Sequence, residues 1–366
     1  MNLSVDLLHQ VLEKAARVGI RLRAEASSKT FSGAENLSRE RLRVAVVGLG
    51  KMGLLHASIL NVLPDAELTA LCDRSSVIRK FCKRIFDEVH VVKDLRKLSG
   101  LDLDVVYVTT PIFSHALVTK NLYLMGIAHD LFVEKTLASS YDEAKELCEL
   151  AQSSGGINMV GYMKRFAVTF RKAKDLLTQE TLGEINSFEA YAYSSDFLGS
   201  SRTSASRGGA LRDLGCHVVD LALWFFGDLQ VDSVKPQLQT EGSSQNSVCF
   251  GVKNSNGLEG RFSVSQCVEN CRLPEMGLLI KGSRGIMRVN DDKVDVKMND
   301  GKSSTQYRHN LNDNVLFWLG EPEYFREDAY FVTSVLQGRS AEPSFHTASK
   351  VDHIIERVRY EIGKNE

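Results

Sequence analysis

The feature that most constrains this chain is a glycine-rich turn placed between a short apolar segment and a helix-like pattern. Residues 44–47 are apolar and mostly β-branched, as expected for a buried strand, and they lead directly into the G-x-G-x-x-G of residues 48–53. In such a turn, Gly48 permits the tight bend, Gly50 lets a pyrophosphate approach the backbone, and Gly53 allows close helix–strand packing. The helix that follows directs N–H groups and partial positive charge at phosphates. We therefore predict a dinucleotide-binding unit, against the alternative of a glycine-rich turn without a ligand. Its predicted loop contacts are Gly48, Gly50, Lys51, Met52 and Gly53.

An acidic residue follows at the spacing that this kind of unit requires. Asp73 ends the next apolar run, Leu68–Cys72, about 20 residues after the glycines. A carboxylate there accepts hydrogen bonds from both ribose hydroxyls and repels a 2′-phosphate, which predicts NAD as the cofactor. The neighbouring Arg74 keeps NADP as an alternative, because a guanidinium can bind that phosphate.

The composition excludes several classes of protein. The chain has 366 residues, a length that predicts two domains. Its 43% hydrophobic and 25% charged residues are typical of a globular protein, and its net charge is −1. A charge so near zero argues against nucleic-acid and membrane-surface partners. Seven scattered cysteines, an odd number, argue against a disulfide framework. We expect a cytoplasmic protein, because the N-terminus lacks the apolar core of a signal peptide and no apolar run is long enough to span a membrane.

The hydrophobic pattern divides the chain into three parts. Residues 1–40 read as an amphipathic helix followed by a Ser-rich linker. Residues 41–161 alternate strand and helix patterns, which predicts an α/β Rossmann domain with a parallel sheet. Residues 162–366 read as an α+β substrate-binding and oligomerisation domain, with a large open sheet that is mostly antiparallel. The expected strands are 42–47, 68–72, 89–92, 105–109, 131–133, 157–160, 185–193, 231–238, 248–252, 258–265, 276–280, 285–289 and 294–298. The expected helices are 53–63, 114–125, 140 to about 155, 168–177, 211–226, 323–336 and 348–360.

Two groups of polar residues come directly after predicted parallel strands, where ligands bind in doubly wound sheets. Thr109, Thr110 and Pro111, with His115, suit a loop that lies along a dinucleotide; an ordinary turn and helix cap is the alternative. Glu134 and Lys135 follow the strand 131–133 at the rim of the sheet, where the lysine can hydrogen-bond a substrate oxygen. A solvated surface ion pair is the alternative for this second group.

A third group lies on the predicted helix 211–226. Asp213 and His217 are four residues apart and therefore share a helix face, which Asp220 continues. An imidazole beside a carboxylate is a plausible general acid or base. A buried structural histidine with satisfied hydrogen bonds is the alternative.

Basic residues precede this helix. The polar segment 194–207 carries Arg202 and Arg207, and Lys164 with Arg165 follows the last strand of the first domain. Arginine forks match phosphate oxygens, so Arg165, Arg202 and Arg207 predict a positive entrance for a phosphate-bearing substrate. A solvated basic loop is the alternative.

Taken in order, the stretches GLGKMGLLHA, TTPIFSH, VEKT and GGALRDLGCHVVDLALWFFG resemble the glucose–fructose oxidoreductase, inositol dehydrogenase and rhizopine-catabolism (Gfo/Idh/MocA) family. The resemblance covers residues 41 to the C-terminus. It implies NAD(P)-dependent oxidation or reduction of a sugar, cyclitol or nucleotide sugar by homodimers or homotetramers. It also implies that Lys135 is the catalytic lysine and that Asp213 and His217 form the Asp-x-x-x-His pair. Thr136 departs from the proline that follows this lysine in the family.

These observations predict hydride transfer between nicotinamide and a secondary alcohol. His217 takes the hydroxyl proton, Lys135 stabilises the same oxygen and Asp213 orients the imidazole. We expect that substrate contacts come from Lys135, Arg165, Arg202, Arg207, Asp213 and His217, and we see no metal-ligand set. Two alternatives are an NAD-dependent glycosidase of the same family, without net redox change, and a non-catalytic dinucleotide-binding protein.

Overall fold

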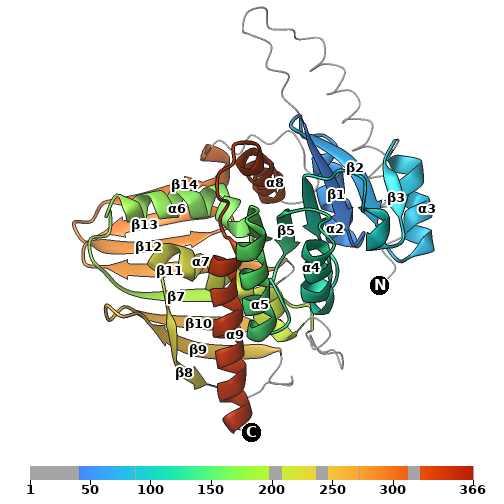
Figure 1. Ribbon diagram of the computed structural model, residues 1–366. Coiled ribbons are helices and arrows are strands. Elements are labelled where there is room, and N and C mark those ends of the chain that lie inside the picture. Colours follow the sequence, from blue (N-terminus) through green and yellow to red (C-terminus); the bar gives the residue numbers. More distant parts are fainter. Residues whose placement is uncertain are drawn as a thin grey trace, which may run out of the picture. The chain divides into compact units, whose positions relative to one another are not determined.

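The computed structural model describes residues 41–86, 88–197, 208–235, 246–271, 273–311 and 322–365. The contacts divide these residues into two compact units. Figure 1 shows their helices and strands, coloured along the sequence. The first unit contains residues 41–138, 142–161 and 322–346, and the second contains the remainder. The predicted helix and linker of residues 1–40, together with Arg202 and Arg207, lie outside the described residues.

The first unit is built on six parallel strands in the order β3-β2-β1-β4-β5-β6, which confirms the predicted Rossmann sheet. Strands β2 and β3 follow on one side of β1, and β4, β5 and β6 follow on the other, so the order of strand addition reverses between β1 and β4. Dinucleotides bind at this kind of switch point. The strands are β1 (Leu42–Val47), β2 (Ala66–Cys72), β3 (His90–Val92), β4 (Val105–Val108), β5 (Asp130–Glu134) and β6 (Asn158–Gly161). The helices are α2 (Lys51–Leu60), α3 (Ser76–Ile85), α4 (His115–Leu124), α5 (Tyr141–Ser154), α8 (Pro322–Leu336) and the short 3₁₀ turns η1 (Leu95–Lys97) and η2 (Ile112–Ser114).

One helix of the first unit comes from the far end of the sequence. Helix α8 packs against α2, and its Phe331 meets the rings of Tyr107 on β4 and Phe132 on β5. The sequence pattern placed everything after residue 161 in the second domain. The contacts instead assign residues 322–346 to the first unit, because the buried face of α8 completes the core beside β4 and β5.

The second unit contains a sheet of eight strands, ordered β14-β13-β12-β11-β7-β10-β9-β8 (Figure 1). Strands β7 and β10 run parallel and the other neighbours run antiparallel, as the mostly antiparallel prediction requires. The strands are β7 (Ile185–Tyr193), β8 (Gln230–Lys235), β9 (Ser247–Lys253), β10 (Glu259–Ser265), β11 (Glu275–Gly282), β12 (Gly285–Asn290), β13 (Lys293–Met298) and β14 (Ser303–Tyr307). The helices are α6 (Val168–Thr178), α7 (Cys216–Phe226), α9 (Phe345–Asn365), the 3₁₀ turns η3 (Met163–Phe166) and η6 (Arg308–Asn310), and the π-helical turn η5 (Leu211–Gly215).

Helices α6 and α7 cover one face of this sheet. Residues on β7 alternate accordingly: Phe188, Ala190 and Ala192 are buried, and Glu189 between them is exposed. The sequence did not predict α3 or β14, and it predicted one regular helix where η5 precedes α7. The other expected elements in the described part of the chain are present close to their expected ends.

Candidate active site

The glycine loop has the geometry that its three glycines predict. Gly48 has a φ of +94°, and a Cβ atom there would lie 2.7 Å from the Thr110 backbone. A Cβ atom on Gly53 would lie 1.8 Å from the carbonyl oxygen of Gly48, so the start of α2 and the loop touch directly. At Gly50, by contrast, a Cβ atom would meet nothing within 4 Å. The loop is therefore closed on its inner side and open at Gly50, which fits the approach of a pyrophosphate to the backbone.

Asp73 connects this loop to the end of the next strand. Its Oδ2 atom accepts a hydrogen bond of 2.7 Å from the backbone N–H of Leu49, and its Oδ1 atom accepts one of 2.7 Å from that of Ser75. The start of α2 has no side-chain cap and no acidic residue in its first turn, so its dipole faces the loop uncompensated. Arg74, which leaves NADP as the alternative cofactor, follows Asp73 directly and is exposed.

The Thr-Thr-Pro segment supports the glycine loop from β4. The Thr109 hydroxyl donates to the carbonyl oxygen of Gly48 over 2.6 Å. His115 is buried, and its two ring nitrogens lie 2.8 Å and 2.7 Å from the carbonyl oxygens of Thr136 and Thr110. Burial lowers the pKa of His115 despite these carbonyls. The imidazole therefore connects the loops after β4 and β5, whereas the sequence placed it along the cofactor.

Glu134, the last residue of β5, is buried, and its carboxylate has two neighbours. Its Oε2 atom accepts a 2.9 Å hydrogen bond from the backbone N–H of Lys135, and its Oε1 atom lies 3.0 Å from Nε2 of His56. Burial disfavours the charged form, yet the hydrogen bond and charge of His56 hold the pKa of Glu134 below its usual value. Lys135 is half-buried, and the peptide bond from Lys135 to Thr136 is cis.

The predicted acid–base pair lies in the second unit, where η5 leads into α7. Asp213 belongs to the π-helical turn, and its Oδ2 atom accepts a hydrogen bond of 3.0 Å from the Gln266 side-chain amide. His217, on the first turn of α7, is 6% exposed and meets the ring of Tyr162 edge-on at 6.1 Å. Such π-turns occur frequently at functional sites. Sequence reasoning did not find Gln266, although it comes directly after a strand end.

Three charged residues near this helix correct the sequence analysis. Asp220, expected on the face of Asp213 and His217, is buried in a two-pronged ion pair with Arg165, at 2.8 Å and 2.6 Å. Lys164 is also buried, and its Nζ atom lies 2.8 Å from Asp291. The expectation that Lys164 and Arg165 line an exposed positive entrance is therefore wrong, because each side chain is matched to a carboxylate inside the unit.

Two further residues of the first unit escaped sequence reasoning. His56 lies on α2, within the stretch GLGKMGLLHA, and its side chain contacts Glu134. The sequence signal for it was a histidine within a predicted apolar helix. Asp328, on α8, contacts His56 at 2.8 Å. No local pattern identifies Asp328, because 272 residues separate it from His56.

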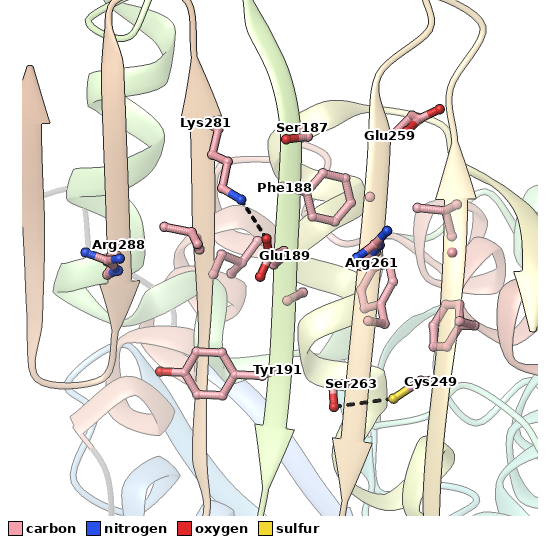
Figure 2. A pocket seen from close by; sticks show the side chains of 18 of the residues that line it. Ser187, Phe188, Glu189, Tyr191, Cys249, Glu259, Arg261, Ser263, Lys281 and Arg288 are labelled. Atoms are coloured by element: carbon pink, nitrogen blue, oxygen red, sulfur yellow. Dashed lines mark hydrogen bonds and ion pairs between the residues drawn. The ribbon is translucent and has the colours of Figure 1, made fainter. Parts of the chain in front are cut away.

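One face of the eight-stranded sheet, which no helix of the described residues covers and which we call the uncovered face, forms a broad hollow of about 1100 Å³ (Figure 2). Charged and polar side chains line it, and Lys281 and Glu189 form an ion pair of 2.7 Å across two strands. Serine and cysteine side chains, Ser263 and Cys249, meet at 3.5 Å on the neighbouring strands. The described residues that line this face include no histidine, so the carboxylate–imidazole combination of η5 and α7 does not recur among them.

Comparisons with known families identify the class of protein. Residues 42–162 match the model of the Gfo/Idh/MocA oxidoreductase family, with its NAD-binding Rossmann fold. Residues 170–288 match the Gfo/Idh/MocA C-terminal domain. Together the matches cover more than half of the chain, which belongs to the Gfo/Idh/MocA family and is an NAD-binding oxidoreductase.

Individual relatives are similar over different lengths. The chain is 28% identical over 217 residues to D-glucoside 3-dehydrogenase of Escherichia coli (strain K12), covering 57% of this chain and 61% of the relative. It is 22% identical over 330 residues to inositol 2-dehydrogenase of Rhizobium meliloti (strain 1021), covering 83% of this chain and 91% of the relative. A solved levoglucosan dehydrogenase in complex with NADH and levoglucosan has the same fold, with a TM-score of 0.77, 20% identity and coverage of 89% and 98% of the two chains. Within the described residues, every helix is too short or too polar to cross a membrane.

Proposed function

We propose that this protein is an NAD-dependent dehydrogenase that acts on a secondary alcohol of a sugar, cyclitol or nucleotide sugar. The observation that carries the proposal is that three of the predicted site residues follow the carboxyl ends of neighbouring parallel strands. Gly48, Thr109 and Lys135 follow the carboxyl ends of β1, β4 and β5, which are neighbours in one sheet. A nucleotide on the glycine loop therefore extends along the carboxyl ends of these strands, where Lys135 also lies.

The roles of the side chains follow from their chemistry. A bound NAD⁺ would supply the acceptor for a hydride from the carbinol carbon of the substrate. His217 takes the proton of the hydroxyl group, so that the C–O single bond becomes a carbonyl. The ammonium group of Lys135 donates a hydrogen bond to the same oxygen and stabilises its developing charge. Asp213, held by Gln266, orients the imidazole and favours its protonated form.

Asp73 supports NAD over NADP in this proposal. Its carboxylate is fixed at the mouth of the glycine loop by the N–H groups of Leu49 and Ser75, where a 2′-phosphate meets negative charge. Binding of NAD⁺ and NADP⁺ to the protein, compared by calorimetry, tests this choice. Tighter binding of NADP⁺ by tenfold assigns the site to Arg74 and contradicts the role of Asp73.

The relatives suggest a polyhydroxylated ring as substrate. Besides the enzymes above, the chain is 23% identical over 250 residues to a glucose-6-phosphate 3-dehydrogenase of Bacillus subtilis (strain 168), covering 64% of this chain and 69% of the relative. We therefore keep a phosphate-bearing substrate in the proposal, with Arg202 and Arg207 as its ligands. Replacement of either arginine by alanine is expected to raise KM for glucose 6-phosphate and to leave NAD⁺ affinity unchanged. Equal turnover of glucose and its phosphate contradicts this part.

The deciding experiment is a panel of substrates with two variants. Glucose, glucose 6-phosphate, UDP-glucose, a nitrophenyl glucoside, myo-inositol and scyllo-inositol are each incubated with NAD⁺, and the absorbances of NADH and of released nitrophenol are followed. On the best substrate, Lys135→Ala and His217→Ala are each expected to lower kcat by about a hundredfold or more, with NAD⁺ affinity unchanged. Glycoside cleavage without net NADH assigns the family's glycosidase reaction instead. Cofactor binding without turnover of any glycoside or alcohol indicates a non-catalytic protein.

We further propose that the uncovered sheet face meets a second copy of the chain in a homodimer or homotetramer. Charges of both signs alternate on it, as in the Lys281–Glu189 pair, and the exposed Ile286 lies on β12. Light scattering of the wild type and of Arg261→Glu with Ile286→Asp tests the assembly. A smaller particle for the double variant is expected, and an unchanged mass places the interface elsewhere.

A further inference from the structure

A buried chain of charged groups lies behind Lys135 in the first unit. His56, on α2, is fully buried and lies between two carboxylates from different parts of the sequence. Its Nδ1 atom is 2.8 Å and 2.9 Å from the two carboxylate oxygens of Asp328 on α8. Its Nε2 atom is 3.0 Å from Oε1 of Glu134 at the end of β5.

This arrangement favours a protonated imidazole. Both nitrogens of His56 face oxygens of Asp328 and Glu134, and an ionised carboxylate only accepts hydrogen bonds, so an imidazole with a proton on each nitrogen satisfies both. Burial raises the pKa of Asp328, and the charge and hydrogen bond of His56 oppose that rise. Burial by itself lowers the pKa of His56, but the charge and hydrogen bond of Asp328, followed by those of Glu134, raise it well above its usual value. Glu134, in turn, uses its second oxygen for the backbone N–H of Lys135 at 2.9 Å.

The rings around His56 restrict its movement. Tyr107, Phe132 and Tyr324 have ring centroids 5.6 Å, 5.2 Å and 6.0 Å from that of the imidazole. The Asp328 carboxylate is also fully buried. The charged groups enclosed by these rings are held in one arrangement, because any other arrangement leaves a buried charge without its hydrogen-bond partner.

We propose that His56 and Asp328 are positioning residues, which fix the Glu134 carboxylate and, through its bond to the Lys135 backbone, the direction of the lysine side chain. This inference rests on the catalytic role proposed above for Lys135. It explains why the first unit includes α8: the helix supplies the carboxylate that completes the chain Asp328–His56–Glu134–Lys135.

A metal ion is the other use for such a cluster, since ligand atoms of His56, Glu327 and Asp328 lie within 4.8 Å of one another. A metal-bound histidine needs an unprotonated nitrogen directed at the ion. Here Nδ1 and Nε2 already face Asp328 and Glu134 at hydrogen-bond distances. The hydrogen-bonded imidazolium therefore accounts for the geometry without an ion. Stoichiometric metal in the purified protein, together with turnover lost on chelation, would overturn this reading.

The test combines two substitutions in one cycle. Asp328→Asn preserves the shape of the side chain and removes its charge. With the best substrate of the panel, we expect kcat to fall by about tenfold or more, because small misplacements of a catalytic group have effects of this order. NAD⁺ affinity should stay within about twofold. In a Lys135→Ala background the same substitution should change kcat by less than about twofold, since residues that act as a unit are non-additive.

A matched control lies on the same helix. Ser334 is also buried on α8, and its hydroxyl donates to the carbonyl oxygen of Tyr330 over 2.8 Å. Ser334→Ala removes a buried polar contact of α8 without touching the charged chain, so kcat should stay within about twofold of the wild type. If Asp328→Asn does not fold, His56→Gln replaces it, because glutamine still offers a donor to Glu134.

A second measurement needs no substrate. Lysines are reductively methylated with ¹³C, and the resonance of Lys135 is assigned as the signal missing from Lys135→Arg. In the NADH-bound protein, this resonance should move in Asp328→Asn and keep its position in Ser334→Ala. An unmoved resonance in a folded Asp328→Asn protein overturns the inference, as does loss of folding in both Asp328→Asn and His56→Gln.

The outcomes separate this inference from the proposed function. Absence of NADH formation with every substrate of the panel rejects the proposed function. Full turnover by Lys135→Ala leaves the dehydrogenase activity in place and removes the lysine from the mechanism, and with it the positioning role proposed here. Loss of turnover in Lys135→Ala, with unchanged kcat in Asp328→Asn, leaves the function in place and rejects the positioning role alone. Equal fractional losses from Asp328→Asn in the wild-type and Lys135→Ala backgrounds also reject it, because they indicate a general effect on the fold.

Discussion

The two sheets of this protein bury different numbers of faces, and their sequences differ for that reason. Every residue of β4, Val105–Val108, is buried, because helices or loops cover both sides of the parallel sheet. Residues on β12 alternate between buried and exposed, because α6 and α7 cover only one side of the larger sheet. A ligand of the first sheet therefore binds at the carboxyl ends of its strands, whereas the second sheet exposes one whole face.

Buried charges follow the same division. In the first unit, the buried ionic chain of Asp328, His56 and Glu134 ends at the backbone of Lys135, at the sheet edge. In the second unit, the buried pair Arg165–Asp220 holds η3 and α7 together, and Arg212 of η5 meets Asp352 of α9 at 2.8 Å. Each of these pairs joins two helical segments of the second unit. The buried ionic groups of the first unit end at the lysine proposed to act on the substrate, whereas those of the second unit join its helices to one another.

The largest expected effect comes from placing the same charge in the centre of each sheet. Val106→Asp puts a carboxylate into a strand buried on both faces and should destabilise the protein by about 4 kcal/mol or more. Ser187→Asp, on the open face of β7 opposite Lys281, is made in the Arg261→Glu, Ile286→Asp variant, which removes the proposed contact with a second copy. There it should change the unfolding free energy by less than about 0.5 kcal/mol. Urea unfolding followed by circular dichroism measures both. Similar losses for the two variants would show that the second sheet is covered on both faces.

A second pair of substitutions tests the edge of the first sheet. Gly53→Ala places a Cβ atom 1.8 Å from the Gly48 carbonyl oxygen and should lower both stability and NAD⁺ affinity. Gly50→Ala meets nothing within 4 Å and should leave the melting temperature unchanged. It should still weaken NAD⁺ binding by about tenfold, because the methyl group occupies the approach of the pyrophosphate. Calorimetric binding and thermal melts measure the pair. Unchanged NAD⁺ binding by Gly50→Ala would move the cofactor away from the loop.

The smallest expected effect is a pH dependence that belongs to the first unit. His56 has a pKa raised by Asp328 and Glu134, whereas an unfolded histidine titrates near about 6.5. Its contribution to stability is therefore complete below the unfolded pKa and is lost as pH rises through the folded pKa. The gap in unfolding free energy between wild type and His56→Gln should therefore narrow as the pH rises above about 6.5, through the raised pKa of the folded state. The gap for Ser334→Ala should stay constant, and a His56→Gln gap that widens with pH would contradict the assigned charge.

Local sequence determined the features that depend on neighbouring residues. The glycine spacing fixed the loop of residues 48–53, and apolar runs located the six parallel strands, because strand burial and turn geometry are short-range properties. The spacing to Asp73 placed a carboxylate beside the loop. The four stretches of residues 48–57, 109–115, 133–136 and 208–227, taken in order, were sufficient to identify the family that the comparisons then showed.

Only the tertiary structure decided which charges are buried and with which partners. Asp328 and His56 are 272 residues apart, and Arg165 and Asp220 are 55 apart, so no local pattern couples them. The sequence also does not show which unit α8 belongs to, because its apolar face could pack in either. The contact between Phe331 and Tyr107 places it in the first unit. The π-helical turn at Asp213 is likewise invisible in a helical pattern. Periodicity shows which side of an element is buried, and packing alone determines what that side contacts.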